Sequence, residues 1–257
     1  MKKILVIGDT IVDKENYSTA RGLSLESPTI KSNLKEKIYR LGGAANLVRH
    51  LKNFNTEIDF FTSTLGIGLD LLKQKNVNVI NFSAPKLNVK SRYWVEKGDS
   101  SYKILQVNDT HPLTCNKKVI SEFKEKVDIF SYEKVVVSDY RLGLVSKELV
   151  KLVSIKSNYS IGASQLSDNA PNYHWFSDFD IVVCNEDESK HTGNCKKVCI
   201  TLGNRGCMIG EKTYPTSVVE NVTTIGAGDA FLGAFAYSND PVAANKYVKN
   251  FLEQAID

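Results

Sequence analysis

Four short runs of apolar, mostly β-branched residues constrain the fold more than any other feature of this sequence. They occupy residues 4–7, 135–137, 181–183 and 198–201. Continuous apolar runs of this length are typical of strands buried on both faces of a parallel sheet. Longer helical patterns lie between them, at residues 43–53, 146–154 and 230–237. This alternation predicts an α/β fold with a doubly wound, mostly parallel sheet.

Two segments depart from this pattern because apolar and polar residues alternate along them, at residues 28–40 and 89–107. In the second, strand patterns at 89–96 and 101–107 flank the turn Lys97-Gly98-Asp99, which predicts an antiparallel hairpin with one wet face. We expect lid segments at about 10–40 and 88–107, forming a small β-sheet on a single domain of residues 1–257. The strand edges of such a lid would suit a second subunit, so a homodimer through the lid is an open alternative to a monomer.

Composition narrows the classes of function. Of the 257 residues, 42% are apolar and 24% charged, as in ordinary globular proteins. The 33 basic and 29 acidic residues give a net charge of +4 and are interspersed, which argues against a nucleic-acid partner. No apolar run approaches the roughly 18 residues of a membrane span. Lys2-Lys3 precedes only four apolar residues, so we expect a first strand, no targeting segment and a cytoplasmic location.

The strongest candidate for chemistry is Gly226-Ala227-Gly228-Asp229, which opens a strongly apolar helical run. Small residues ahead of a helix leave its first N–H groups free, and with the helix dipole these donors form an anion site. Asp229 would stand beside that site, where an incoming hydroxyl could lose its proton. Phosphoryl transfer to an alcohol requires this combination. For the motif in isolation, a simple turn followed by a helix-terminal carboxylate remains the alternative.

Four motifs, in order along the chain, resemble the PfkB/ribokinase family of carbohydrate kinases. The diglycine signature is matched by Leu41-Gly42-Gly43-Ala44-Ala45-Asn46, and the NxxE motif by Asn185-Glu186-Asp187-Glu188. The nucleotide-site segment is matched by Thr201-Leu202-Gly203-Asn204-Arg205-Gly206, and the C-terminal signature by Thr224-Ile225-Gly226-Ala227-Gly228-Asp229-Ala230-Phe231. The resemblance covers nearly the whole chain. It implies a ribokinase-like fold, ATP and Mg²⁺ as cofactors, and phosphoryl transfer to a sugar hydroxyl.

Within that family the sequence is most similar to the D-glycero-D-manno-heptose-7-phosphate kinases, the kinase domains of ADP-heptose synthesis proteins. Their opening GD-x-x-x-D is matched by Gly8-Asp9-Thr10-Ile11-Val12-Asp13, and their S-x-E-x-P stretch by Ser24-Leu25-Glu26-Ser27-Pro28. Ser138-Asp139-Tyr140 matches their SDY, and Lys90-Ser91-Arg92 a K-x-R on a lid strand. This narrower resemblance implies a sugar phosphate substrate, heptose 7-phosphate, and a 1,7-bisphosphate product.

The resemblance also assigns roles to residues. The transfer site is Asp229 as base with Gly226, Ala227 and Gly228 as the anion hole. On the substrate side, sugar hydroxyls and the substrate phosphate are held by Asp9, Asp13, Gly42, Gly43, Asn46, Lys90, Arg92 and Asp139. On the nucleotide side are Asn185, Glu188, Thr201, Gly203, Gly206 and Asn245, with Glu188 positioning Mg²⁺ through water. Structural alternatives stay open, namely turn capping for Asp9 and Asp13 and a solvated face for Lys90 and Arg92.

Three positions depart from the family pattern. Thr223 replaces an aspartate associated in many members with a monovalent cation, Leu142 replaces a lysine after SDY-x, and Ala163 lies where an aspartate is usual after a strand. The transfer machinery is untouched by these changes. They leave two alternatives, a non-catalytic regulator that binds a nucleotide or sugar phosphate, and a kinase for another sugar.

Overall fold

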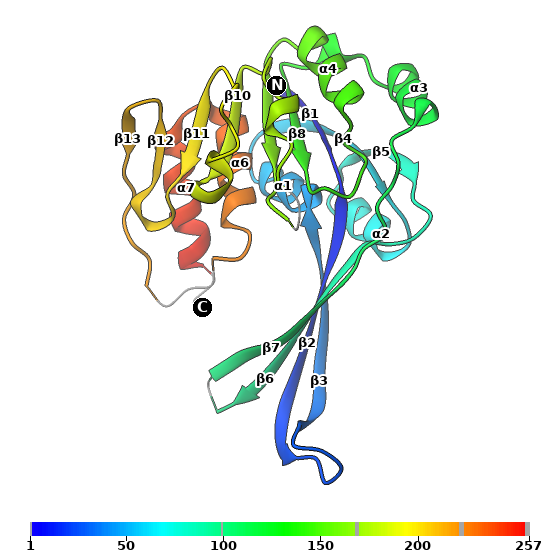
Figure 1. The fold of residues 1–257 in the computed structure, drawn as a ribbon, viewed down its shortest axis with the longest axis vertical. Coiled ribbons are helices and arrows are strands. Elements are labelled where there is room, and N and C mark those ends of the chain that lie inside the picture. The colour runs from blue at the N-terminus through cyan, green and yellow to red at the C-terminus, as the bar shows by residue number, and fades with distance from the viewer. Residues whose placement is uncertain (1, 99, 168–169, 221–223, 255–257) are drawn as a thin grey trace.

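The large sheet is mostly parallel, as the alternating pattern predicts. The computed structural model describes residues 2–98, 100–167, 170–220 and 224–254, and within them nine strands form one sheet in the order β13-β12-β11-β10-β9-β8-β1-β4-β5 (Figure 1). Their bounds are β1 Lys2–Gly8, β4 Thr56–Thr64, β5 Asn78–Ser83, β8 Lys134–Asp139, β9 Ser160–Ser164, β10 Ile181–Asn185, β11 Val198–Thr201, β12 Cys207–Ile209 and β13 Lys212–Tyr214. All neighbours from β11 to β5 pair in parallel, and β12 and β13 continue antiparallel.

Helices cover both faces of this sheet (Figure 1). They are α1 Ala44–Leu51, α2 Ile67–Lys73, α3 Lys117–Lys126, α4 Lys147–Lys156, α5 Glu186–Ser189, α6 Ala227–Ser238 and α7 Pro241–Glu253, with 3-10 turns at Ile129–Ser131, Tyr173–Trp175 and Gly203–Arg205. The three helices expected from the sequence correspond to α1, α4 and α6. None of the helices in the described ranges is long and apolar enough to cross a membrane.

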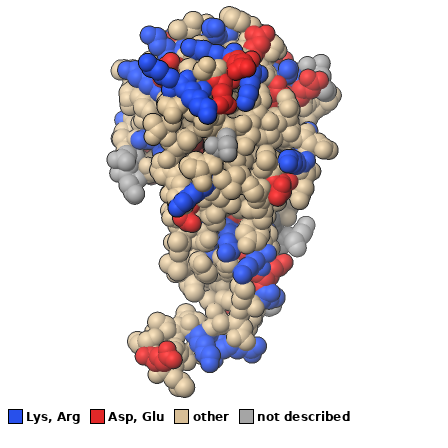
Figure 2. Space-filling model, turned by 90° about the vertical axis from the view of Figure 1, so that its right-hand side faces the viewer, with Lys and Arg blue, Asp and Glu red and all other residues tan. Residues whose placement is uncertain are grey.

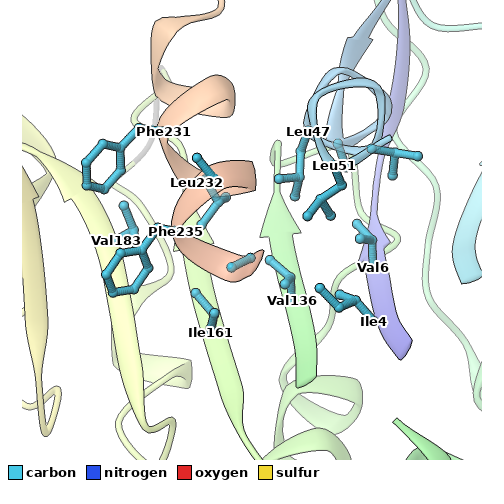
Figure 3. Packing of buried hydrophobic residues seen from close by; sticks show 14 of the residues in the cluster. Ile4, Val6, Leu47, Leu51, Val136, Ile161, Val183, Phe231, Leu232 and Phe235 are labelled. Carbon is cyan, nitrogen blue, oxygen red and sulfur yellow. The ribbon is translucent and has the colours of Figure 1, made fainter. Parts of the chain in front are cut away.

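Two hydrophobic cores lie on opposite faces of the sheet, because successive side chains of a strand point to opposite sides. Ile4 and Val6 of β1 belong to the core beneath α1, α6 and α7, whereas Leu5 and Ile7 belong to the core beneath α3 and α4. Figure 3 shows the first core, where the aromatic rings of α6 and the leucines of α1 lie over the strands. Each fully buried side chain of this size contributes about 1.5–3 kcal/mol, so the core fixes the position of α6 on the sheet.

The topology reverses at the centre of the sheet. From β1 the chain passes to β4 and β5 on one side, and it later returns to add β8, β9 and β10 on the other. In open α/β sheets, ligands bind beyond the carboxyl ends of the strands at such a switch point. The loops that follow β1 and β8 therefore mark the place for a site.

A separate four-stranded sheet projects from the main body (Figures 1 and 2). Its strands are β2 Thr10–Leu23, β3 Ile30–Gly43, β6 Val89–Lys97 and β7 Ser100–Asp109, in the order β3-β2-β6-β7. We call this sheet the lid. The antiparallel pairing of β6 with β7 agrees with the expected hairpin, and β2 pairs in parallel with β6. The expectation of one wet face was wrong for β7, because every residue of that strand is exposed.

Helix α6 is anchored at both ends. Gly226, which precedes it, has a left-handed backbone with a φ of 84°, and the helix begins three residues earlier than its apolar run indicates. At the other end, the buried ammonium of Lys134 donates to the carbonyl of Ala236 over 2.7 Å. A cation at a helix C-terminus satisfies free carbonyls and complements the dipole. The N-terminal turn of α6 is thus held at a defined place at the edge of the sheet.

Candidate active site

The carboxylate of Asp229 is held by hydrogen bonds to both of its oxygen atoms. Tyr140 Oη donates to Oδ1 over 2.5 Å, and Asn46 Nδ2 donates to Oδ2 over 2.7 Å. Burial raises the pKa of Asp229 to about 6, and the two hydrogen bonds act in the opposite direction. The carboxylate is therefore mainly ionised at neutral pH and fixed in orientation. A general base needs both properties.

The start of α6 forms an anion site that is smaller than expected. A Cβ on Gly226 would lie 3.0 Å from Asn46 Nδ2, and its positive φ also favours glycine. The Ala227 N–H donates to the carbonyl of Thr224 over 3.1 Å, so the expectation that this group is free was wrong. No described backbone carbonyl accepts from the N–H groups of Gly228 and Asp229. These two donors, at the positive end of the helix dipole, remain able to bind an anion.

Six of the expected substrate-binding residues line one cavity of about 180 Å³, shared with Tyr140 and Asp229. These six are Asp13, Gly42, Gly43, Asn46, Lys90 and Arg92. We call it the sugar-side cavity. A Cβ on Gly42 would lie 2.6 Å from Asp13 Oδ2, so only bare backbone fits beside that carboxylate. The lid strands β2, β3 and β6 therefore supply one wall of the cavity, and α6 supplies another.

Arg92 lies between two carboxylates inside the lid. Its Nη1 is 2.6 Å from Glu15 Oε1 and 3.2 Å from Asp13 Oδ1, and Trp94 Nε1 donates to Glu15 Oε2 over 2.5 Å. Arg92 is thus already paired with two carboxylates of the protein, and its expected contact with the substrate phosphate stays a prediction. No described residue donates a hydrogen bond to the buried Asp13 Oδ1. An acceptor left without a donor suits a sugar hydroxyl.

Lys90 differs from Arg92 in its surroundings. Among the described residues, no hydrogen bond or ion pair engages its ammonium group. Burial raises the pKa of Asp13, and the charges of Arg92 and Lys90 lower it. The sugar-side cavity thus combines one compensated cation with one that can pair with an anionic ligand.

Asp9 does not line this cavity, contrary to expectation. Its carboxylate is buried and accepts the backbone N–H groups of Tyr140, Leu142 and Leu144 at 3.2, 3.4 and 3.2 Å. Burial raises the pKa of Asp9 to about 7, the charge of Asp139 adds to this, and the three hydrogen bonds lower it. Asp9 therefore organises the loop after β8 and so places Tyr140. The turn-capping alternative describes this residue better than sugar binding.

Asp139 is likewise engaged by the protein itself. Its carboxylate accepts hydrogen bonds from the Arg141 N–H, from Ser164 Oγ and from Asn172 Nδ2, at 2.9, 2.8 and 2.9 Å. Only 1% of the residue is exposed, and it lines neither the sugar-side cavity nor its neighbours. Asp139 is therefore held by Arg141, by Ser164 at the end of β9 and by Asn172, and its contact with a substrate stays a prediction.

Four of the expected nucleotide residues line a second cavity of about 220 Å³, the nucleotide-side cavity. They are Thr201, Gly203, Gly206 and Asn245. The Asn245 amide donates to the carbonyl of Tyr214 over 2.7 Å, which ties α7 to β13. Gly206 has a φ of 92°, and a Cβ there would overlap the Tyr214 carbonyl oxygen, so glycine is required. Thr223 lies outside the described residues.

Asn185 and Glu188 form a capping box at the start of α5. Asn185 Oδ1 accepts the Glu188 N–H over 2.9 Å, and Glu188 Oε2 accepts the Asn185 N–H over 3.0 Å. The other carboxylate oxygen accepts the Leu166 N–H over 3.2 Å. Both side chains line a third cavity of about 90 Å³. The described residues contain no group of three or more His, Cys, Asp or Glu that could hold a metal ion.

The three cavities meet at the first turn of α6. Gly228 lines all of them, and Asp229 lines the sugar-side cavity and the third cavity. Two free N–H donors and a fixed carboxylate therefore lie where the nucleotide side and the sugar side come together. This geometry brings an anion site and a base to one point.

Two residues of this arrangement were missed from the sequence. Tyr140 belongs to the SDY motif, in which the sequence assigns a role only to the neighbouring Asp139. Gln165 follows β9 and lines both the sugar-side and the third cavity. The position of Tyr140 directly after a buried strand was a usable signal. Nothing in the sequence marked Gln165.

Part of the chain matches a known protein family. Residues 177–245 match the pfkB family carbohydrate kinases. The bifunctional protein HldE of Helicobacter pylori strain HPAG1 is 25% identical over 255 residues, which covers 96% of this chain and 54% of that protein. The bifunctional protein HldE of Campylobacter fetus is 28% identical over 271 residues, covering 92% and 58%. The chain thus spans about half the length of the curated relatives it matches.

Solved structures share the fold. A phosphofructokinase-2 mutant from Escherichia coli aligns with a TM-score of 0.70 and 15% identity, covering 100% of this chain and 94% of that one. Ribokinase from Thermotoga maritima aligns with a TM-score of 0.66 and 16% identity, covering 100% and 94%. The fold is ribokinase-like. The matching family model and the HldE relatives support a sugar kinase, a phosphotransferase with an alcohol acceptor. Over residues 177–245 the chain is similar to the pfkB family of carbohydrate kinases.

Proposed function

We propose that this kinase transfers the γ-phosphoryl group of ATP to a hydroxyl of a sugar phosphate. The observation that carries the proposal is the place of Asp229, a fixed carboxylate that lines the sugar-side cavity next to Gly228, which lines the nucleotide-side cavity as well. An acceptor hydroxyl in the sugar-side cavity would lie between this base and the two free N–H groups of α6. Positioning and charge stabilisation of this kind account for most of the catalysis in phosphoryl transfer.

In the proposed reaction the sugar hydroxyl oxygen attacks the γ-phosphorus, and the bond from that phosphorus to the β–γ bridging oxygen breaks. The hydroxyl proton passes to Asp229, and ADP leaves with the electron pair of the broken bond. The N–H groups of Gly228 and Asp229 would stabilise negative charge on the transferring group. Removing one such donor typically lowers kcat by about 10²–10³.

The proposed acceptor is heptose 7-phosphate, giving a heptose 1,7-bisphosphate. Support comes from the lid and loop motifs that this chain shares with heptose-7-phosphate kinases, and from its similarity to HldE proteins. Lys90, an uncompensated cation on a lid strand, would pair with the substrate phosphate. Asp13 would accept a sugar hydroxyl through Oδ1, which is ion-paired with Arg92 but accepts no hydrogen bond from the described residues.

ATP and Mg²⁺ are the proposed cofactors. Thr201, Gly203, Gly206 and Asn245 would line the nucleotide, and bare backbone at the two glycines allows its close approach. Mg²⁺ usually keeps several waters and binds through phosphates and one or two carboxylates. Glu188 fits an indirect role of that kind, since its oxygens already accept backbone N–H groups. When bound, the ion would neutralise phosphate charge.

The proposed assembly is a homodimer through the lid. Many of the exposed large apolar side chains of the described residues belong to lid strands, and among them Tyr102, Leu105 and Val107 lie on the edge strand β7. Exposed apolar surface of this extent on a strand edge is typical of an interface. A second copy of this chain would cover it.

The function is tested by ADP release from ATP–Mg²⁺ with a panel of heptose, hexose and pentose phosphates and free sugars. We expect activity with heptose 7-phosphate, and an Asp229→Asn variant that binds ATP normally but turns over about 10²–10⁴ times more slowly. Near-normal turnover by that variant contradicts the assignment of the base. Activity confined to unphosphorylated sugars contradicts the substrate, and nucleotide binding without ADP release from any sugar identifies a non-catalytic regulator.

A further inference from the structure

The Asn46 amide connects Asp229 to a cation deeper in α1. While Nδ2 donates to Asp229 Oδ2 over 2.7 Å, Oδ1 accepts from Arg49 Nε over 3.0 Å. A guanidinium can only donate and an ionised carboxylate can only accept. The amide therefore has a single orientation that satisfies both neighbours. Because Asn46 is buried, a reversed amide would leave two unfavourable contacts away from water.

Arg49 is itself held in place from the side opposite to Asn46. Its Nη2 lies 3.2 Å from His50 Nε2, and its guanidinium lies over the ring of Phe251 at 5.9 Å. Burial, and then the charge of Arg49, lowers the pKa of His50 to about 4, so this imidazole is neutral at neutral pH. A neutral Nε2 accepts from Arg49 while Nδ1–H faces the Tyr247 hydroxyl at 3.1 Å. The guanidinium thus has one defined position.

No carboxylate of the described residues forms an ion pair with Arg49. Burial lowers its pKa, and the charges of Asp229 and Asp13 are among those that raise it. Burying a cation without a direct counterion costs free energy, so we expect an acid on which Arg49 could act. The acid that lies at the end of its hydrogen-bond chain is Asp229.

We propose that Arg49 is a positioning residue, which orients the Asp229 carboxylate through the Asn46 amide and supplies positive charge toward it. The proposal rests on the proposed function, in which Asp229 is the base. Arg49 itself lines neither the sugar-side nor the nucleotide-side cavity. It therefore acts on the reaction without touching either substrate.

Other titratable groups also face Asp229 and remain in any variant of Arg49. These groups are the Tyr140 phenol, the Asp13 carboxylate, the cations Lys90 and Arg92 in the sugar-side cavity, and Glu188 in the third cavity. A comparison that changes only Arg49 holds their contributions constant. The difference between two pH profiles then reports Arg49.

The test compares kcat against pH for the unchanged protein and for Arg49→Met, Arg49→Lys and Lys52→Gln. Lys52 follows Arg49 on the same helix end, and its ammonium donates to the Asn76 carbonyl, so its variant removes a charge without touching the chain to Asp229. For Arg49→Met we expect the acid limb to move upward by about one pH unit and the plateau kcat to fall about tenfold. Arg49→Lys, which keeps the charge, is expected to recover part of the shift.

The inference is overturned if the acid limb of the kcat profile of Arg49→Met coincides with that of the unchanged protein. It is also overturned if the acid limb of Lys52→Gln moves by the same amount as that of Arg49→Met. A fall in kcat with an unchanged KM for ATP supports it, because a general loss of structure would lower kcat and also raise the KM. The Asp229→Asn variant separates the two proposals. If Asp229→Asn is inactive while Arg49→Met has the kcat and pH profile of the unchanged protein, Asp229 remains the proposed base and the proposed role of Arg49 is wrong.

Discussion

The phenol of Tyr140 and the carboxylate of Asp229 are joined by a hydrogen bond of 2.5 Å across 89 residues of sequence. Tyr140 begins the loop after β8, which Asp9 organises, and Asp229 lies in the first turn of α6. The bond therefore ties the centre of the sheet to the helix that carries the anion site.

Loss of this hydrogen bond should impair catalysis more than stability. In Tyr140→Phe, the Asp229 carboxylate loses a donor that favours its ionised form, and its orientation then depends on Asn46 alone. We expect kcat to fall about tenfold or more, with the acid limb of its pH profile moved upward. Steady-state kinetics between pH 5 and 8 measure both effects.

Tyr132→Phe is the matched control for that variant. Tyr132 Oη donates to Asp59 Oδ2 over 2.5 Å, in a buried pair remote from the three cavities. Its loss should lower the free energy of unfolding by about 1–3 kcal/mol without changing kcat. Equal kinetic losses in the two variants would show that Tyr140 has only a structural role.

The pH dependence of kcat should follow the ionisation of Asp229. Burial raises the pKa of this carboxyl to about 6, above its ordinary value. A base works in its ionised form, so activity should be nearly full at pH 7.5 and fall as the pH drops through 6. At pH 5 about one tenth of the base is ionised, which predicts roughly a tenfold loss. A kcat that stays level between pH 7 and 5 would contradict this assignment.

Lys90 and Arg92 should respond to substitution in opposite ways. Arg92→Met leaves the Asp13 and Glu15 carboxylates uncompensated inside the lid, which we expect to cost about 3–5 kcal/mol of unfolding free energy. Lys90→Met breaks no ion pair among the described residues, so stability should change little while the KM for the sugar phosphate rises. Thermal unfolding and substrate saturation curves distinguish the two. Equal KM effects at equal stability would mean that Arg92 also binds the substrate phosphate.

The lid homodimer predicts a monomer when its edge strand is made polar. Leu105 and Val107 lie two residues apart on β7, so they share one face of the strand. A Leu105→Lys and Val107→Lys double variant should elute as a monomer in size-exclusion chromatography with light scattering. Ile155→Lys, at an exposed position on α4, is the control. An unchanged dimer in the double variant would place the interface elsewhere.

Much of the fold was predictable from periodicity because the strands of the main sheet are buried on both faces. Residues 4–7 and 135–137 lie inside β1 and β8, and the expected helix at 230–237 falls within α6. The lid was harder to predict, since its pairing of β2 with β6 joins segments about 75 residues apart. That register places Glu15 opposite Arg92, and no local pattern reveals such a contact.

The place of Asp229 and its neighbouring glycines at the start of a helix was predictable, because the Gly-Ala-Gly-Asp motif directly precedes an apolar helical run. The site was not predictable where a carboxylate could serve either substrate or backbone. Asp9 and Asp139 follow buried strands just as a ligand-binding acid would, yet the loop after β8 turns its N–H groups toward Asp9. Only the path of that loop decides between the two roles.

The lid supplies Asp13, Gly42, Gly43, Lys90 and Arg92 to one wall of the sugar-side cavity, whereas the residues of the nucleotide-side cavity come from β11 onward. In the proposed reaction, the choice of acceptor and the use of ATP would therefore depend on separate stretches of the chain. Acceptor preference can diverge through changes in four outlying strands while the phosphate donor site is inherited intact. A chimera that receives β2, β3, β6 and β7 from a kinase of the same fold would be expected to take on the sugar of its donor.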